Sequence, residues 1–153
     1  IVTAESYFNL KRYLDLDFEH LIDERVRDRI DLGKSQSALD YISIKEDRAR
    51  LNKKIKRLFD NESFLLMPTI ATNTPKIKDL EMDKNYFHRI NGMVLRNTMI
   101  GNYFNLPGVT FPNGYDSNGL PTGILMSSYS FFDEKLICYA RSIEKILHNH
   151  FKF

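Results

Sequence analysis

The chain has 153 residues, of which 42% are hydrophobic and 27% charged, a composition typical of a globular protein and not of a disordered or fibrous one. Its 22 Lys and Arg residues nearly balance 20 Asp and Glu residues, so the net charge of +2 provides no field that would attract nucleic acid or an acidic membrane. The one cysteine, Cys138, excludes an internal disulfide framework and a multi-cysteine zinc site. No apolar run approaches the roughly 20 residues that cross a bilayer, and the first residues lack a secretory signal, so we expect a cytoplasmic protein.

The first 60 residues are predicted to be mainly helical. Apolar spacing indicates one helix from Thr3 to Leu14. A second helix is expected to begin at Asp17, its N-cap, and to end at Gly33, which we expect in a left-handed terminating conformation. A third is expected to start at Ser35 or Ser37 and to run to about Asp60. Its middle, KEDRARLNKK, is mostly charged, which favours a helix that covers a larger body with one narrow face.

Residues 61–153 predict the order strand, helix, strand, strand, helix. The apolar run from Phe64 to Met67, ended by Pro68, is typical of a strand buried on both faces. We expect Pro112 to end the next strand. In the last helix Leu136, Ile137, Ala140, Ile143 and Leu147 form one apolar stripe, and Cys138 is expected to be buried near its packed side. The remaining expected elements are an irregular loop over 68–83, a helix over 85–104, strands over 109–111 and 123–126 joined through Asn118-Gly119, and a helix over 133–148.

These elements predict an α/β fold in which helices surround a few strands of an incomplete mixed sheet. A sheet of three short strands has open edges, which proteins normally close. We therefore expect the missing strands to come from the remainder of a longer chain or from a second copy by self-association. The numbering begins at Ile1 and not at a methionine, which favours a piece of a longer protein.

One stretch from Asn102 onward, NYFNLPGVTFPNGYDSNGLPTGILMSSYSFFDEKLICYA, carries several motifs in a fixed order. It resembles the C-terminal signature of the amidase signature family, and two upstream passages, RVRDRIDLGK and FLLMPT, are similar to family segments as well. The resemblance implies that residues 1–153 form one C-terminal segment of the family's α/β/α fold. The matching positions are Asn102, Leu106-Pro107, Pro112-Asn113-Gly114, Gly119-Leu120-Pro121 with Gly123, and Asp133-Glu134.

The resemblance also implies a reaction, the hydrolysis of an amide C–N bond. The family uses a serine nucleophile, a second serine in a cis peptide and a lysine base, and it needs no metal or organic cofactor. The serines at 35 and 37 and at 127, 128 and 130 have the pattern of caps and turns, outside any glycine-rich segment. We therefore expect no catalytic residue here, and no amide hydrolysis by this chain by itself. No metal site is expected either, because His148 and His150 do not align on a helix face.

Four residues are candidates for the wall of a substrate pocket that accepts a small amide in the complete enzyme. Pro68 and Thr69 follow the first strand, and residues at the carboxyl ends of strands commonly border sites in α/β folds. Asn97 and Asn102 lie on the predicted helix that leads to the Leu-Pro strand. They are five residues apart on one helix, so we expect at most one of them to point into a cleft.

Two alternatives remain open. The chain also resembles the A subunit of glutamyl-tRNA(Gln) amidotransferase, and the basic stretch RARLNKKIKR is compatible with such a complex. Asn97 stands where that subunit would be expected to carry an acidic residue, which argues against it, and the stretch is better interpreted as a solvated helix face than as a nucleic-acid contact. The second alternative is a non-enzymatic interaction domain derived from an amidase.

Overall fold

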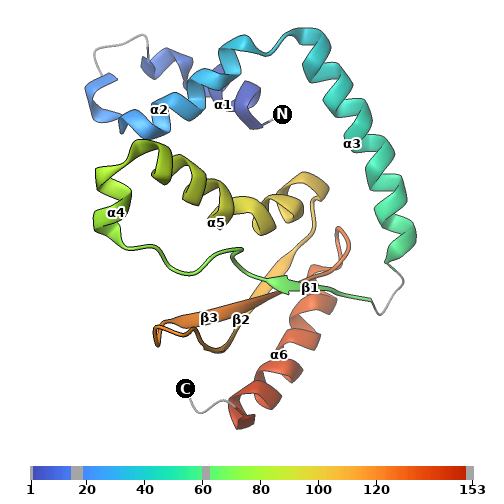
Figure 1. The fold of residues 1–153 in the computed structure, drawn as a ribbon. Helices are drawn as coiled ribbons and strands as arrows, with labels where there is room; N and C mark the ends of the chain where they lie inside the picture. Colours follow the sequence, from blue (N-terminus) through green and yellow to red (C-terminus); the bar gives the residue numbers. More distant parts are fainter. Residues whose placement is uncertain (1, 15–18, 60–62, 151–153) are drawn as a thin grey trace. The chain divides into compact units, whose positions relative to one another are not determined.

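The computed structural model describes residues 2–14, 19–59 and 63–150, and its chain divides into two compact units, Ile1–Leu51 and Asn52–Phe153. The first unit holds α1 (Val2–Leu14), η1 (Glu19–Leu21), α2 (Glu24–Asp31), η2 (Leu32–Ser35) and the start of α3 (Ala38–Leu58). The second holds the end of α3, then β1 (Leu65–Pro68), α4 (Ile77–Met82), α5 (Lys84–Phe104), β2 (Gly108–Tyr115), β3 (Pro121–Ser127) and α6 (Asp133–His150) (Figure 1).

Two helices of the first unit, α2 and α3, begin at side-chain caps. Asp17 lies outside the described residues, and the N-cap of α2 is Asp23, whose carboxylate accepts a 2.8 Å hydrogen bond from the backbone N–H of Arg25. Hydrogen bonds from the Arg25 side chain and backbone lower the pKa of Asp23 to about 2. Ser37 caps α3, because its hydroxyl accepts from the backbone N–H of Asp40 at 3.1 Å, while the Asp40 carboxylate accepts from the Ser37 N–H at 3.0 Å.

Gly33 serves close packing and not the expected left-handed helix end. It lies within η2, and its φ is not positive. A Cβ at this position would overlap the Thr3 carbonyl and the Cβ of Tyr7, both on α1. The glycine therefore lets α1 lie directly against the segment that follows α2.

The second unit is built on a three-stranded antiparallel sheet in the order β1-β3-β2. The sheet pairs Leu66 with Met126 and Phe111 with Ile124. This confirms the predicted α/β class, and all pairs among the three described strands are antiparallel. β1 is also not buried on both faces: its residues alternate, and Leu66 is 58% exposed. Both β1 and β2 are edges of the described sheet.

β2 continues through Pro112 instead of ending there. It pairs Pro112 with Gly123 and Gly114 with Thr122, with a bulge at Asn113 between the two pairs. The prediction failed because β2 is an edge strand, where a proline removes no bond to a second neighbour. The bulge bends the end of the hairpin, and Asp116 closes the turn by accepting from the N–H groups of Asn118 and Leu120.

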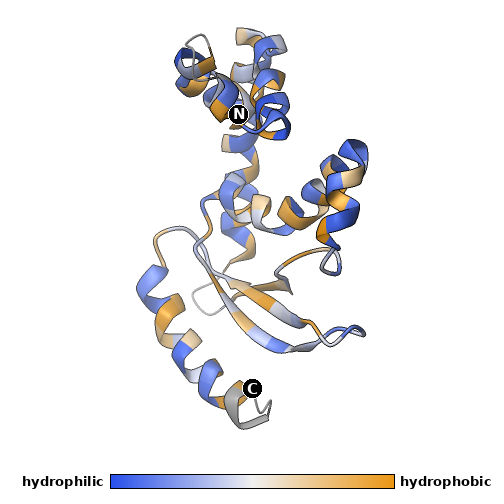
Figure 2. Ribbon diagram, turned by 90° about the vertical axis from the view of Figure 1, so that its left-hand side faces the viewer, coloured by the Kyte–Doolittle hydropathy of each residue, from blue (hydrophilic) through white to orange (hydrophobic). Residues whose placement is uncertain are grey.

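The core of the second unit lies between α6 and one face of the sheet. Leu136 and Ala140 on α6 pack against Phe111 and Met126. Figure 2 shows that α6 carries hydrophobic and hydrophilic residues along its length, as expected for a helix with one buried side. Two expectations for this helix are wrong: Ile137 is 55% exposed and Cys138 is exposed, because both follow Leu136 onto the outer side of α6.

The segment between β1 and α5 is more regular than the sequence predicts. The six residues of α4 form a helix inside the expected irregular loop. α5 begins one residue earlier than predicted, because Asp83 caps it by accepting from the backbone N–H groups of Asn85 and Tyr86 at 2.8 and 3.0 Å. None of the described helices is both long enough and apolar enough to cross a membrane.

Candidate substrate pocket

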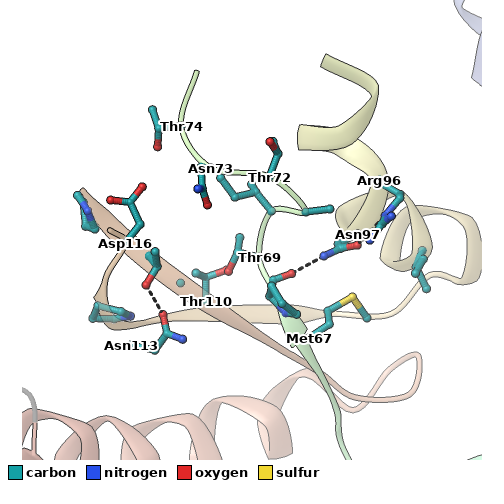
Figure 3. Close-up of a pocket in the computed structure, with 18 residues that line it drawn as sticks. Met67, Thr69, Thr72, Asn73, Thr74, Arg96, Asn97, Thr110, Asn113 and Asp116 are labelled. Carbon is teal, nitrogen blue, oxygen red and sulfur yellow. Dashed lines mark hydrogen bonds between the residues drawn. The ribbon is translucent and has the colours of Figure 1, made fainter. Parts of the chain in front are cut away.

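A pocket of about 940 Å³ lies in the second unit, where β1 ends (Figure 3). Three parts of the chain form its lining: the end of β1 and the segment after it, the β2–β3 hairpin, and two turns of α5. The lining residues are Met67, Pro68, Thr69, Ile70, Ala71, Thr72, Asn73, Thr74, Arg96, Asn97, Ile100, Thr110, Pro112, Asn113, Asp116, Pro121, Thr122 and Gly123.

Thr69 lies at the centre of this lining, and the sheet fixes its position. Its backbone N–H donates to the Gly123 carbonyl at 2.9 Å, and its hydroxyl donates to the Thr110 hydroxyl at 3.4 Å. A Cβ on Gly123 would lie 2.9 Å from both the Thr110 methyl and the Thr69 hydroxyl oxygen. Gly123 therefore allows the two threonines to meet above the hairpin, and their hydroxyls form one polar patch in the pocket.

Asn97 connects α5 to the end of β1. Its side chain is 7% exposed, and its Nδ2 donates a 2.6 Å hydrogen bond to the Pro68 carbonyl. A buried side-chain amide needs such a partner, because leaving it unpaired costs about 1–3 kcal/mol. The structure thus brings three of the four predicted pocket residues, Pro68, Thr69 and Asn97, into one lining.

Asn102 does not join them. It is exposed and lines a second hollow of about 630 Å³, together with Asn105, Pro107, Ser130 and other residues at the end of α5. The two asparagines therefore line two different hollows. Five residues correspond to about 500° around a helix, so Asn97 and Asn102 are directed to different sides.

Most of the polar lining was not predicted from the sequence. Arg96 follows Leu95 on α5, Thr110 and Asn113 lie on β2, and Asp116 and Thr122 belong to the turn of the hairpin and to β3. Alternation would have revealed Thr110, because Val109 and Phe111 face α6 and the residue between them must face the other side of the sheet. Asn113 had a weaker signal, because it occupies the bulge, where its Oδ1 accepts a 2.9 Å hydrogen bond from the Thr122 hydroxyl.

The pocket lining offers groups that can form hydrogen bonds with an amide. Hydroxyls, a carboxamide, a guanidinium and a carboxylate line it, and no serine, cysteine, histidine or lysine is among its described lining residues. The described part of the chain also contains no cluster of three His, Cys, Asp or Glu residues that would hold a metal ion. These lining groups provide hydrogen bonds and charge with which a ligand can be recognised.

The serines at 127–130 have turn contacts. Ser127 and Ser128 are 2% and 3% exposed, and the Ser128 hydroxyl donates to the carbonyls of Tyr129 and Phe132 at 3.4 and 3.5 Å. The Ser130 hydroxyl donates to the Asn105 carbonyl at 2.8 Å. The Ser130 bond joins the segment after β3 to the end of α5, whereas the Ser128 bonds lie within that segment. None of the three lines the pocket of about 940 Å³.

Comparison with known proteins assigns the family. A family model described as "Amidase" matches residues 4–137, which is most of the chain. The chain belongs to the amidase family. It is 32% identical over 141 residues to a 2-amino-5-chloromuconic acid deaminase of Comamonas testosteroni, covering 90% of this chain and 30% of that protein. A fatty acid amide hydrolase of Oryza sativa subsp. indica is 25% identical over 123 residues, covering 78% of this chain and 20% of the hydrolase.

Solved structures of this family share the fold. An allophanate hydrolase variant of Kluyveromyces lactis superimposes with a TM-score of 0.71 at 26% identity, covering 88% of this chain and 21% of that one. The K. lactis urea amidolyase superimposes with a TM-score of 0.80 at 24% identity, covering 95% of this chain and 8% of the amidolyase. The chain thus spans less than a third of the length of these amidase relatives, and its similarity to the C-terminal family signature is confirmed.

Proposed function

We propose that this chain is the C-terminal segment of an amidase signature amidohydrolase and forms one wall of its substrate pocket. The observation that carries the proposal is the composition of the pocket: its described lining offers several hydrogen-bonding groups and a central pair of threonine hydroxyls, without a serine, cysteine, histidine or lysine. A wall of this kind binds and orients an amide, and another part of the enzyme must supply the reacting groups.

The reaction of the complete enzyme is the hydrolysis of a small amide. A serine nucleophile in the remainder of the enzyme attacks the amide carbonyl, the C–N bond breaks, and the amine leaves with a proton. Water then releases the acid from the acyl-serine. The threonine hydroxyls of this chain both donate and accept hydrogen bonds, so they match the N–H and C=O groups of an amide. Asn97 contributes indirectly, since it holds the end of β1 on which Thr69 is placed.

The remainder of the amidase is the proposed partner, and we place the enzyme in the cytoplasm on the basis of its composition. The edges of β1 and β2 in the described sheet are the surfaces that the missing strands would cover. No membrane or nucleic-acid partner is required by this proposal.

The test is to read the gene upstream of the codon for Ile1 and to express its full product beside the 153-residue chain. We expect an upstream glycine- and serine-rich segment, amide turnover by the full product, and loss of that turnover when the upstream nucleophilic serine is changed to alanine. Thr69→Val in the full product is expected to weaken substrate binding by a few-fold, because valine has a methyl group in place of the hydroxyl that faces Thr110.

Each alternative has its own result in the same experiment. Ammonia release from glutamine only in the presence of partner subunits would favour the amidotransferase. A full product without a nucleophilic serine, which binds other proteins and hydrolyses no amide, would favour the interaction domain and contradict the proposal.

A further inference from the structure

The charged groups of the pocket are separated along its lining. Among the described lining residues Arg96 is the cation and Asp116 is the anion. Figure 3 shows them on opposite sides of Thr69 and Thr110, with Arg96 on α5 and Asp116 on the β2–β3 hairpin. A ligand that spans the pocket therefore meets a positive group at one end and the threonine hydroxyls in the middle.

Arg96 is oriented by its neighbour. Its Nε donates a hydrogen bond of 3.4 Å to Oδ1 of Asn97, and Nδ2 of Asn97 donates to the Pro68 carbonyl at 2.6 Å. Asn97 is buried, so this chain of contacts runs from the end of β1 through a fixed amide to the guanidinium. Orientation of this kind reduces the side-chain entropy that an arginine loses when it binds a ligand.

The two Nη groups of Arg96 remain available. Within the described part of the chain Arg96 forms no ion pair, although other arginines do: Arg25 pairs with Asp23 and Arg50 with Asp47. A guanidinium presents its N–H groups in a planar fork that matches the two oxygens of a carboxylate.

The hairpin end of the pocket, at Asp116, offers an anion no comparable set of free N–H donors among the described lining residues. One carboxylate oxygen of Asp116 accepts from the backbone N–H groups of Asn118 and Leu120 at 2.8 and 2.9 Å, which commits the residue to the hairpin turn. Its negative charge repels an anion at the hairpin end, so an anionic group on the ligand is favoured at the α5 end.

We propose that the substrate of this pocket is an amide that also carries a carboxylate, and that Arg96 binds this carboxylate as a specificity-determining residue. The carboxylate accepts hydrogen bonds from the Nη groups of Arg96, and the amide lies against the hydroxyls of Thr69 and Thr110. The inference rests on the proposed function, since it names the class of amide that the pocket wall recognises.

The test compares two ligands of nearly equal shape. Succinamate carries an amide and a carboxylate, and succinamide carries an amide at both ends. Each is titrated into the full product of the gene, in which the upstream nucleophilic serine is changed to alanine so that the ligand is not hydrolysed, and the dissociation constant is measured from the amide NMR signals of Thr69, Thr110 and Gly123. We expect succinamate to bind about three- to tenfold more tightly, a gain between that of an exposed ion pair and that of a charge-assisted hydrogen bond in a pocket. Added salt is expected to reduce the preference.

Two arginines of α5 provide matched variants. Arg96→Gln is expected to bring the ratio of the two dissociation constants close to one, and Arg96→Lys to restore part of it, because lysine keeps the charge and loses the fork. Arg89→Gln removes the same charge from the same helix at a residue that stacks over Tyr86 outside the pocket, and it is expected to leave the ratio unchanged.

The outcomes separate this inference from the proposed function. Equal affinities for the two ligands, with signals of the pocket shifting in both titrations, would overturn the role of Arg96 and leave the pocket wall in place. A preference for succinamate that Arg89→Gln lowers as much as Arg96→Gln would also overturn it, because the preference would then follow the net charge of the chain. Shifts with neither ligand would count against the pocket wall and this inference together.

Discussion

The bond between Asn97 and Pro68 makes the pocket wall testable without any substrate. Replacing Asn97 by alanine removes the 2.6 Å hydrogen bond that joins α5 to the end of β1. The net loss of such a bond is about 0.5–1.5 kcal/mol, and the space left by a side chain that is 7% exposed adds to it. Because Pro68 itself is exposed, water can reach part of its carbonyl, which keeps the total near 1–2 kcal/mol.

Asn102 is the matched control for this variant. It lies on the same helix, is exposed, and gains the same helix propensity when it becomes alanine. The difference between Asn97→Ala and Asn102→Ala in the free energy of unfolding therefore reports the buried contact and not the propensity of α5.

The assay must report the second unit separately, because the chain has two compact units. Urea unfolding followed through the amide NMR signals of Leu125 and Met126, both buried in the sheet, meets this need. We also expect faster hydrogen exchange at the Thr69 N–H, which donates to Gly123, when the end of β1 is released. A difference below about 0.3 kcal/mol between the two variants, with unchanged exchange at Thr69, would refute the tethering role of Asn97.

Three further predictions concern the fold. Leu136→Ala is expected to lower the free energy of unfolding by about 2–5 kcal/mol, since Leu136 is 2% exposed. Ile137→Ala, at the neighbouring residue that is 55% exposed, is expected to lower it by less than about 1 kcal/mol. Equal losses of the two variants in urea unfolding would contradict the observed buried face of α6. The Asp23 carboxyl is expected to have a pKa of about 2 and not 3.8. The contribution of this cap to stability is therefore present above about pH 4 and disappears as the pH falls toward 2. An NMR titration midpoint close to 3.8 would show that the hydrogen bonds from Arg25 do not lower the pKa of Asp23. The purified chain is expected to self-associate through the open edge of β1, and Leu66→Lys is expected to reduce this self-association. A sedimentation profile that shows a monomer for both the unchanged chain and the Leu66→Lys variant would argue against self-association.

The helices and most strands of this chain follow from local patterns. Apolar spacing predicts α1, α3, α5 and α6 within a few residues of their observed ends, because each is long enough to show a helical period. α4 escaped prediction because six residues are too few for such a period. Ile137 and Cys138 were assigned to the wrong face, since a broad apolar stripe does not tell which of its edges meets the sheet.

The pocket was predictable only where one strand end marks it. Pro68 and Thr69 stand at the end of a visible strand, and Asn97 was found because the family signature draws attention to the helix before the Leu-Pro strand. The contacts of Thr110, Asn113 and Thr122 depend on the register of β2 against β3 and on the bulge at Asn113. A one-residue shift of that register would turn each side chain to the other face, and nothing in the sequence specifies the bulge.

If this chain provides a pocket wall and no reacting group, the purified 153-residue chain has no amide turnover of its own. Ammonia release from succinamate and succinamide is followed at high protein concentration, beside a sample with each serine from 127 to 130 changed to alanine. We expect that neither sample releases ammonia above the buffer blank. Steady turnover by the unchanged chain that disappears in the serine variant would contradict it, because the nucleophile would then lie within these residues.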